Sequence, residues 1–246
     1  MIEIIPTNTC PPTLAELSLR SRAIAQFSPH IQLDVDDGAF APEISWPYHD
    51  GEWAELEKMA VNEEMLPFSD VLKYEAHLMV EEPLRVGELL ARVGCSRILA
   101  HVEAFEDAQS VVDAFEAWKM AGAVEVGLAV LIDTQLSALE PYIEKCNAVQ
   151  LMSIAKLGRQ GAPFESRIIH RIEELHNRHP DLTIAVDGGV SETNVAQLVR
   201  AGASRFGVGS AIMKAQNPKA AYENLKTIAE NATERRATTE RRARKY

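Results

Sequence analysis

The stretch LTIAVDGGVSETNVAQLVRAGASRFGVG, residues 182–209, contains one complete unit of the fold. It begins with the aliphatic run 182–186, passes a pair of glycines, continues with apolar residues at helical spacing within 195–199, and turns through a glycine into the run 205–209. Aliphatic runs separated by an amphipathic segment are typical of parallel strands joined by a helix. The order strand, helix, glycine, strand therefore predicts a parallel α/β sheet, with Ser191 as the N-cap of the helix.

The same unit recurs along the chain. Short aliphatic or β-branched runs are predicted strands, and they cover residues 2–5, 31–35, 74–80, 97–102, 125–132, 148–152, 182–186 and 205–209. Eight strand–helix units in about 230 residues favour a closed (β/α)8 TIM barrel over an open doubly wound sheet. No GxGxxG motif follows the first run, which argues against a dinucleotide-binding domain. We expect one barrel over residues 1–232, followed by a basic tail or helix extension over 233–246.

Composition and charge exclude several classes of protein. Of the 246 residues 46% are hydrophobic and 25% charged, and no apolar run is long enough to span a bilayer. Residues 1–10 lack the features of a secretory signal, and three widely spaced cysteines suit reduced thiols, so we expect a cytoplasmic protein. The net charge of -11 argues against nucleic acid as the main partner, although the last thirteen residues hold six Arg or Lys against two Glu.

Polar side chains end several of the predicted strands. In a barrel of this kind the active site lies at the C-terminal ends of the strands. Strand-end residues besides the aspartates are Thr7, Asn8, Thr9, Gln32, His77, Met79, His101, Glu103, Met152, Ser153, Gly207, Gly209 and Ser210. Alternate residues of a strand share a face, so Gln32 points with Asp34, and His77 points with Met79.

Asp34, His77 and Asp187 fall at the same level of the predicted barrel. Two carboxylates with a histidine can hold a divalent cation, or they can act as base and acid on opposite faces of a substrate. A strand-end aspartate more often only caps the following turn, and we assign that role to Asp36 and Asp37, which precede a glycine. For Asp34, His77 and Asp187 together we favour function.

Two glycine-rich loops, VDGGV at 186–190 and FGVGSAI at 206–212, follow the last two strands. Barrels often bind phosphate between strands 7 and 8, where backbone N–H groups and helix N-termini can hold a dianion. Glycines also serve plain turns, but two such loops at this place predict a phosphorylated ligand. We expect the backbone amides of Gly188, Gly189, Gly209 and Ser210 to bind it.

These motifs together resemble the ribulose-phosphate 3-epimerase family, over about residues 2–229. The matching segments, in the family's order, are 34–42 (DVDDGAFAP), 77–83 (HLMVEEP), 101–104 (HVEA), 151–153 (LMS), 186–190 (VDGGV) and 209–212 (GSAI). The resemblance implies a TIM barrel of the ribulose-phosphate-binding type, usually as a homo-oligomer. It also implies an isomerase that interconverts ribulose 5-phosphate and xylulose 5-phosphate by epimerisation at carbon 3.

The resemblance also implies roles for individual residues. Asp34 and Asp187 match the acid/base pair, which removes a proton from one face and returns one to the other through an enediolate. With His77 they match the ligands of a divalent metal ion (Zn, Mn, Fe or Co), which stabilises the oxyanion as a Lewis acid. Apolar or hydroxyl residues that match the family's substrate contacts are Met79, Met152 and Thr7.

This sequence departs from the family's pattern at several positions. Gln32 stands where the family usually has histidine, and an amide is a weaker zinc ligand than an imidazole. Asp36 and Ala39 replace a usual methionine and histidine. Lys156 and Arg159 lie in the loop after the sixth strand, where they could bind an anion or merely contact water.

The epimerase has two kinds of alternative, a barrel that only binds a phosphosugar and another phosphosugar enzyme. One is a non-catalytic or altered-specificity barrel that binds a phosphosugar, which the change at Gln32 makes credible. The related decarboxylases need an Asp-x-Lys-x-x-Asp pattern, and the second strand has no such lysine. Cys10 could suggest a phosphoribosyl isomerase, but the sixth strand offers no partner carboxylate.

Overall fold

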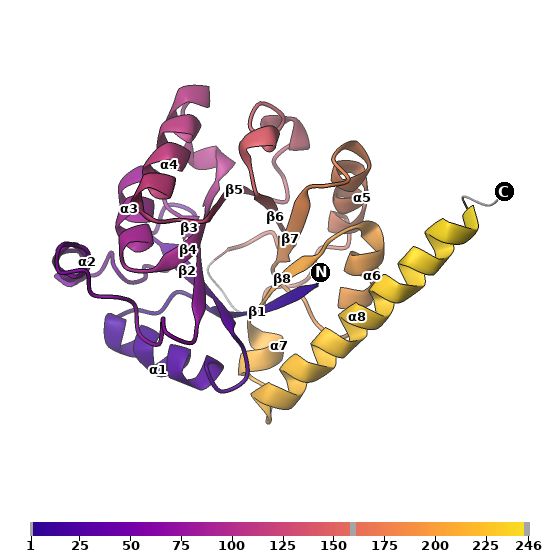
Figure 1. Ribbon diagram of the computed structural model, residues 1–246, viewed down its shortest axis with the longest axis horizontal. Coiled ribbons are helices and arrows are strands. Elements are labelled where there is room, and N and C mark those ends of the chain that lie inside the picture. Colours follow the sequence, from indigo (N-terminus) through magenta and orange to yellow (C-terminus); the bar gives the residue numbers. More distant parts are fainter. Residues whose placement is uncertain (1, 158–160, 244–246) are drawn as a thin grey trace.

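The computed structural model, which describes residues 2–157 and 161–243, closes eight parallel strands into one barrel (Figure 1). The strands are β1 (Glu3–Asn8), β2 (His30–Asp36), β3 (Lys73–Met79), β4 (Cys95–His101), β5 (Glu125–Val130), β6 (Ala148–Met152), β7 (Thr183–Asp187) and β8 (Arg205–Val208). Each strand pairs with the next, and β8 returns to β1. The predicted TIM barrel is confirmed, and each predicted strand is present. β1 extends past its predicted end, so Thr7 lies within the strand.

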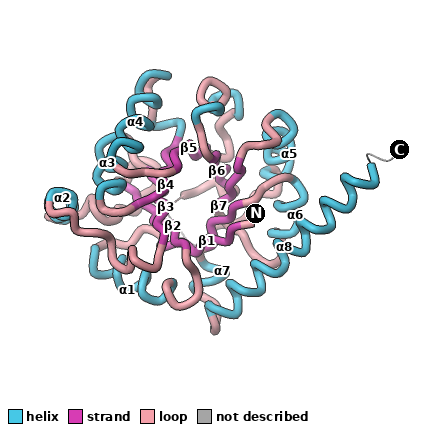
Figure 2. The backbone as a smooth tube through the Cα atoms, viewed as in Figure 1, coloured by secondary structure: helices cyan, strands magenta, loops and turns pink. Residues whose placement is uncertain are grey.

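Helices surround the ring of strands (Figure 2). They are α1 (Leu14–Ile24), α2 (Glu52–Val61), α3 (Pro83–Arg92), α4 (Ala108–Ala121), α5 (Ile168–Arg178), α6 (Val195–Ala201), α7 (Ser210–Met213) and α8 (Pro218–Ala243). Leu225 and Ala229 of α8 are buried against the barrel, and the helix then continues past it (Figure 1). Within the described ranges, none of these helices has both the length and the apolar content that a membrane span requires.

One connection differs from the expected alternation of strand and helix. Between β5 and β6 the chain forms short 3-10 turns, η2 (Leu136–Ala138) and η3 (Ile143–Lys145), in place of an α-helix. Pro141 lies between them and lacks the N–H that a continuous helix would need.

The prediction of Ser191 as an N-cap was wrong. Asn194 is the N-cap of α6, and the Ser191 carbonyl accepts a hydrogen bond from the Asn194 N–H in the turn before the helix. The Asn194 side chain accepts from the Ser191 N–H at 2.9 Å and donates to the Gly189 carbonyl at 2.9 Å. Asn194 therefore closes the glycine-rich loop after β7, and α6 begins beyond that loop.

Charged side chains from several strands meet inside the N-terminal end of the barrel. Arg205 of β8 contacts Glu3 of β1 at 3.0 Å, Glu75 of β3 at 3.2 Å and Glu125 of β5 at 2.8 Å. Arg97 of β4 contacts Glu3 at 2.7 Å and Glu125 at 3.2 Å. Burial alone would raise the pKa of Glu3, but the two arginines outweigh it and lower this pKa to about 2. This network, which we call the basal ion network, ties five strands together.

Replacement of Arg205 by methionine should destabilise the barrel. The Arg205 side chain is 6% exposed and that of Glu75 is 2% exposed, so the variant leaves buried carboxylates short of a partner. Loss of one member of a buried ion pair typically costs about 3–5 kcal/mol, whereas an exposed pair contributes about 1 kcal/mol or less. Urea unfolding should therefore show a loss of about 3 kcal/mol for Arg205→Met. The control Arg92→Met, in an exposed pair with Glu88, should lose less than about 1 kcal/mol. Equal losses in the two variants would contradict a stabilising role for the network.

Candidate active site

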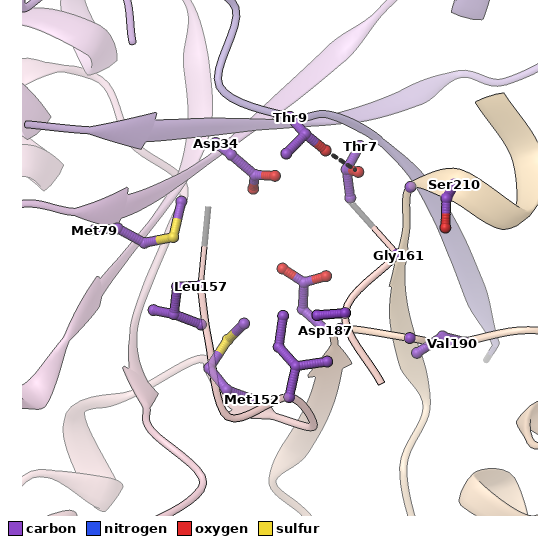
Figure 3. A pocket seen from close by; sticks show the side chains of 15 residues that line it. Thr7, Thr9, Asp34, Met79, Met152, Leu157, Gly161, Asp187, Val190 and Ser210 are labelled. Atoms are coloured by element: carbon purple, nitrogen blue, oxygen red, sulfur yellow. Dashed lines mark hydrogen bonds between the residues drawn. The ribbon is translucent and has the colours of Figure 1, made fainter. Parts of the chain in front are cut away.

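A pocket opens at the C-terminal end of the barrel, where the sequence predicts the site (Figure 3). Its lining residues are Thr7, Thr9, Asp34, Met79, Met152, Ile154, Leu157, Gly161, Ala162, Asp187, Gly188, Gly189, Val190, Gly209 and Ser210. The structure thus brings together the two predicted acid/base aspartates and the predicted substrate and phosphate contacts. These residues come from β1, β2, β3, β6 and β7, from the loops after β1, β6, β7 and β8, and from the start of α7.

The pocket has a polar side and an apolar side. Figure 3 shows Asp34 and Asp187 facing each other, with Met79, Met152 and Leu157 to one side and Thr7, Thr9 and Ser210 to the other. The methionines pack in a small apolar cluster that also contains Ala41, Ile154 and Leu157. A ligand with one apolar or non-ionic portion and one anionic end would match this division.

Gln32 and His77 lie beneath the pocket and contact both carboxylates. The Gln32 amide Nε2 donates to Asp34 Oδ1 at 2.7 Å and to Asp187 Oδ2 at 3.0 Å. Nδ1 of His77 lies 3.3 Å and 3.5 Å from the same two oxygens. Gln32 and His77 are fully buried, so these contacts to the carboxylates are shielded from solvent.

Burial and charge shift the pKa values of these groups in different directions. Burial raises the pKa of Asp34, and the nearby Asp187 charge raises it further, which makes Asp34 a stronger base. Burial alone would lower the pKa of His77, but its hydrogen bonds to Asp187 and Asp34 and their charges raise it to about 9. An imidazolium at this place compensates the carboxylate pair.

A second histidine continues the network behind His77. Nε2 of His101 lies 3.0 Å from Nε2 of His77, and Nδ1 of His101 lies 3.2 Å from Glu103 Oε2. Burial lowers the pKa of His101 to about 4, so this ring is neutral at pH 7. Burial alone would raise the pKa of Glu103, but hydrogen bonds from His101 and from the backbone of Leu131 lower it.

Several strand-end residues lie outside the pocket. The Asn8 side chain donates to the Leu17 carbonyl of α1, and the Ser153 hydroxyl contacts the carbonyls of Asp187 and Gly188. Asp36 accepts from the Gly38 N–H, and Asp37 accepts from the N–H groups of Ala39 and Glu81. The turn-capping role predicted for Asp36 and Asp37 is therefore confirmed. Lys156 is exposed and is not among the lining residues, and Arg159 lies outside the described residues.

Sequence reasoning missed part of the lining. The loop after β6, which also contains Lys156, contributes Ile154, Leu157 and Ala162 to the lining. Their apolar side chains cover the side of the pocket that the two methionines form. Leu157 is 5% exposed although it lies in a loop. In the sequence, Leu157 is an apolar residue five positions after Met152, and this alone does not distinguish it from other apolar residues in loops.

The model of the ribulose-phosphate 3 epimerase family matches residues 20–213. The chain belongs to this family. The ribulose-phosphate 3-epimerase of Aquifex aeolicus is 32% identical over 202 residues, which cover 80% of this chain and 83% of the relative. That of Schizosaccharomyces pombe is 30% identical over 161 residues, 65% of this chain and 68% of the relative.

Solved structures of other proteins share the fold of this chain. The 3-hexulose-6-phosphate synthase of Salmonella typhimurium matches with a TM-score of 0.65 at 16% identity, covering 94% of this chain and 100% of that one. KGPDC from Streptococcus mutans matches with a TM-score of 0.66 at 12% identity, covering 94% of this chain and 98% of that one. At these identities the likeness shows the barrel alone.

The residues at the carboxylate pair fit the divalent metal that the family implies. Asp34, His77 and Asp187 offer ligand atoms within 4.8 Å of one another, and two carboxylates with an imidazole suit first-row divalent ions. Gln32 presents N–H to this point, while its Oε1 is buried and meets no hydrogen-bond donor among residues 2–157 and 161–243. The opposite amide orientation would present Oε1 as a further oxygen ligand, which is favourable only with a cation between the carboxylates.

Gln32→His should increase the retention of zinc. An imidazole nitrogen is a better zinc ligand than an amide oxygen. The variant also removes the amide N–H groups that now donate hydrogen bonds to both carboxylates. We expect Zn²⁺ binding to tighten by about 10-fold or more, measured by competition with a chromophoric chelator and by metal content after dialysis. The matched control is His49→Gln, at an exposed histidine, which should leave retention unchanged. If Gln32→His and the parent chain hold equal zinc, Gln32 is not a ligand.

Proposed function

We propose that the protein is a ribulose-phosphate 3-epimerase, which interconverts ribulose 5-phosphate and xylulose 5-phosphate by proton transfer at carbon 3. The observation that carries the proposal is the pair Asp34 and Asp187, which face each other across one pocket (Figure 3). Epimerisation needs one group that removes a proton from one face of the carbon and a second that returns a proton to the other face. Membership of the family and the names of the curated relatives support the same reaction.

The pocket's two sides support a phosphorylated sugar as the substrate. Gly188, Gly189, Gly209 and Ser210 offer backbone N–H groups beside the hydroxyls of Thr7 and Thr9, which suit the 5-phosphate. Met79 and Met152 form an apolar wall at the reacting end, which would shield the enediolate from bulk water. The polar side of the pocket would thus take the phosphate end of a ketopentose 5-phosphate, and the apolar side would take its reacting end.

Asp34 and Asp187 also carry out the proton transfers in this proposal. Asp34, whose pKa burial raises, is basic enough to accept a proton from the carbon next to the carbonyl. The Gln32 amide donates hydrogen bonds to both carboxylates, and His77 compensates their charge. When bound at Asp34, His77 and Asp187, a divalent metal ion would act as a Lewis acid toward the substrate oxygens. A cytoplasmic location and a homo-oligomer remain predictions.

Asp34→Asn and Asp187→Asn should each abolish turnover. Loss of a general acid or base typically lowers a rate by about 10²–10⁴, and neither amide can accept a carbon-bound proton. The measurement is a coupled assay on ribulose 5-phosphate with added Mn²⁺, Zn²⁺, Co²⁺ or Fe²⁺, alongside deuterium exchange at carbon 3 in D₂O. Asp70→Asn, at an exposed aspartate outside the pocket, is the matched control and should keep full activity.

The same assay separates the epimerase from a non-catalytic phosphosugar-binding barrel. The N–H groups of Gln32, which occupy both carboxylates, favour that second function. Binding of ribulose 5-phosphate without exchange at carbon 3, under every metal, would reject the epimerase and support the binding protein.

Gly209→Val should weaken the binding of the phosphate. Gly209 lines the pocket immediately before α7, so a branched side chain there would stand in front of the amides proposed to hold the anion. We expect the KM for ribulose 5-phosphate to rise about 10-fold or more, because one or two charge-assisted hydrogen bonds to the phosphate would be lost. Inhibition by inorganic phosphate should weaken in parallel. An unchanged KM with unchanged phosphate inhibition would place the anion elsewhere.

A further inference from the structure

A chain of hydrogen bonds leads from the carboxylate pair across β3 and β4 to the residue that follows β5. It runs from Asp34 and Asp187 through His77 and His101 to Glu103, whose Oε1 accepts from the Leu131 N–H at 2.9 Å. The proposed reaction makes no use of His101 or Glu103, although both belong to the motif HVEA at 101–104.

The donor and acceptor atoms of these groups determine which residue donates at each step of the hydrogen-bond chain. An ionised carboxylate only accepts hydrogen bonds, so the 3.2 Å contact between Glu103 and His101 needs a hydrogen on Nδ1 of His101. A neutral imidazole with its hydrogen on Nδ1 has a lone pair on Nε2. The 3.0 Å contact between the two Nε2 atoms then needs its hydrogen on His77.

Both rings are packed in the interior and shielded from solvent. His77 and His101 are both fully buried, with ring centroids 5.1 Å apart. The ring of Phe40 lies over His101 at a centroid distance of 4.9 Å. Glu103 is the exposed end of the chain, with 21% of its side chain accessible.

We infer that His101 and Glu103 are positioning residues that keep a hydrogen on Nε2 of His77, and so reserve Nδ1 for Asp34, Asp187 or a cation between them. A ring nitrogen that always carries a hydrogen cannot bind a metal or remove a proton. The imidazole therefore acts toward the pocket through one defined atom. The inference rests on the proposed function only in taking Asp34 and Asp187 as the working pair.

The test is ¹⁵N NMR of protein labelled at histidine, which reports whether each ring nitrogen carries a hydrogen. In the parent protein we expect His101 to carry hydrogen on Nδ1 alone, and His77 to carry it on Nε2. His101→Phe assigns the His101 signals and should also change those of His77, because its Nε2–H loses its acceptor. A hydrogen found on Nε2 of His101 in the parent protein would overturn the inference.

Glu103→Gln should reverse the chain. The amide oxygen can still accept from the Leu131 N–H, which turns the amide NH₂ toward Nδ1 of His101. His101 should then carry its hydrogen on Nε2, and His77 should lose the hydrogen on its own Nε2. Glu106→Gln, an exposed residue three positions on, is the matched control and should leave both rings unchanged.

The variant also separates this inference from the proposed function. Replacement of such outer partners typically weakens metal binding by about 10–100-fold, so Mn²⁺ affinity measured by titration should fall about 10-fold or more in Glu103→Gln. Unchanged ring signals in Glu103→Gln would reject the positioning role even if the protein turns over ribulose 5-phosphate. The expected signals without any turnover would keep the positioning role and reject the epimerase.

Discussion

A charged group inside this barrel is stable only against an opposite charge or a hydrogen-bond donor, and that constraint organises the whole interior. At the N-terminal end, Arg97 and Arg205 compensate the carboxylates of the basal ion network. At the C-terminal end, His77 and Gln32 compensate Asp34 and Asp187. The barrel thus has two compensated polar levels, and the upper one opens to the pocket.

The fold could be predicted because each strand is a short aliphatic run between amphipathic segments, and the ends of β7 and β8 carry glycines. The basal ion network could not be predicted as a network. Glu75, Arg97 and Arg205 stand near the start of their strands, where a charged residue usually faces water, and only the barrel's register makes them partners. The sequence signal for the network was the two-residue spacing of Glu75, His77 and Met79, which places these three side chains on one face of β3. The N-cap prediction for Ser191 was wrong because serine is common in turns as well as at N-caps.

The identities of the site residues could be predicted from strand ends, but their hydrogen bonds could not. Asp34, His77 and Asp187 converge because parallel strands end at one edge. The orientation of the Gln32 amide depends on which atoms surround it, and Gly207 leaves room for its buried Oε1: a Cβ there would lie 3.0 Å from that oxygen. The chain from His77 to Glu103 depends on side-chain rotamers, which sequence spacing does not specify. Leu157 covers the pocket from a loop whose path the strand pattern leaves undetermined.

The basal ion network and the site are coupled through register. Glu75 pairs with Gln32 across β3 and β2, and two residues further on His77 pairs with Asp34. Arg205 pairs with Ala185 across β8 and β7, and two residues further on Gly207 pairs with Asp187. A slip of β3 by one residue would turn Glu75 of the network and His77 of the site outward together. Because unpaired buried charges are costly, the ion pairs at one end of the barrel favour the register of β3 that places His77 beside the carboxylates at the other end.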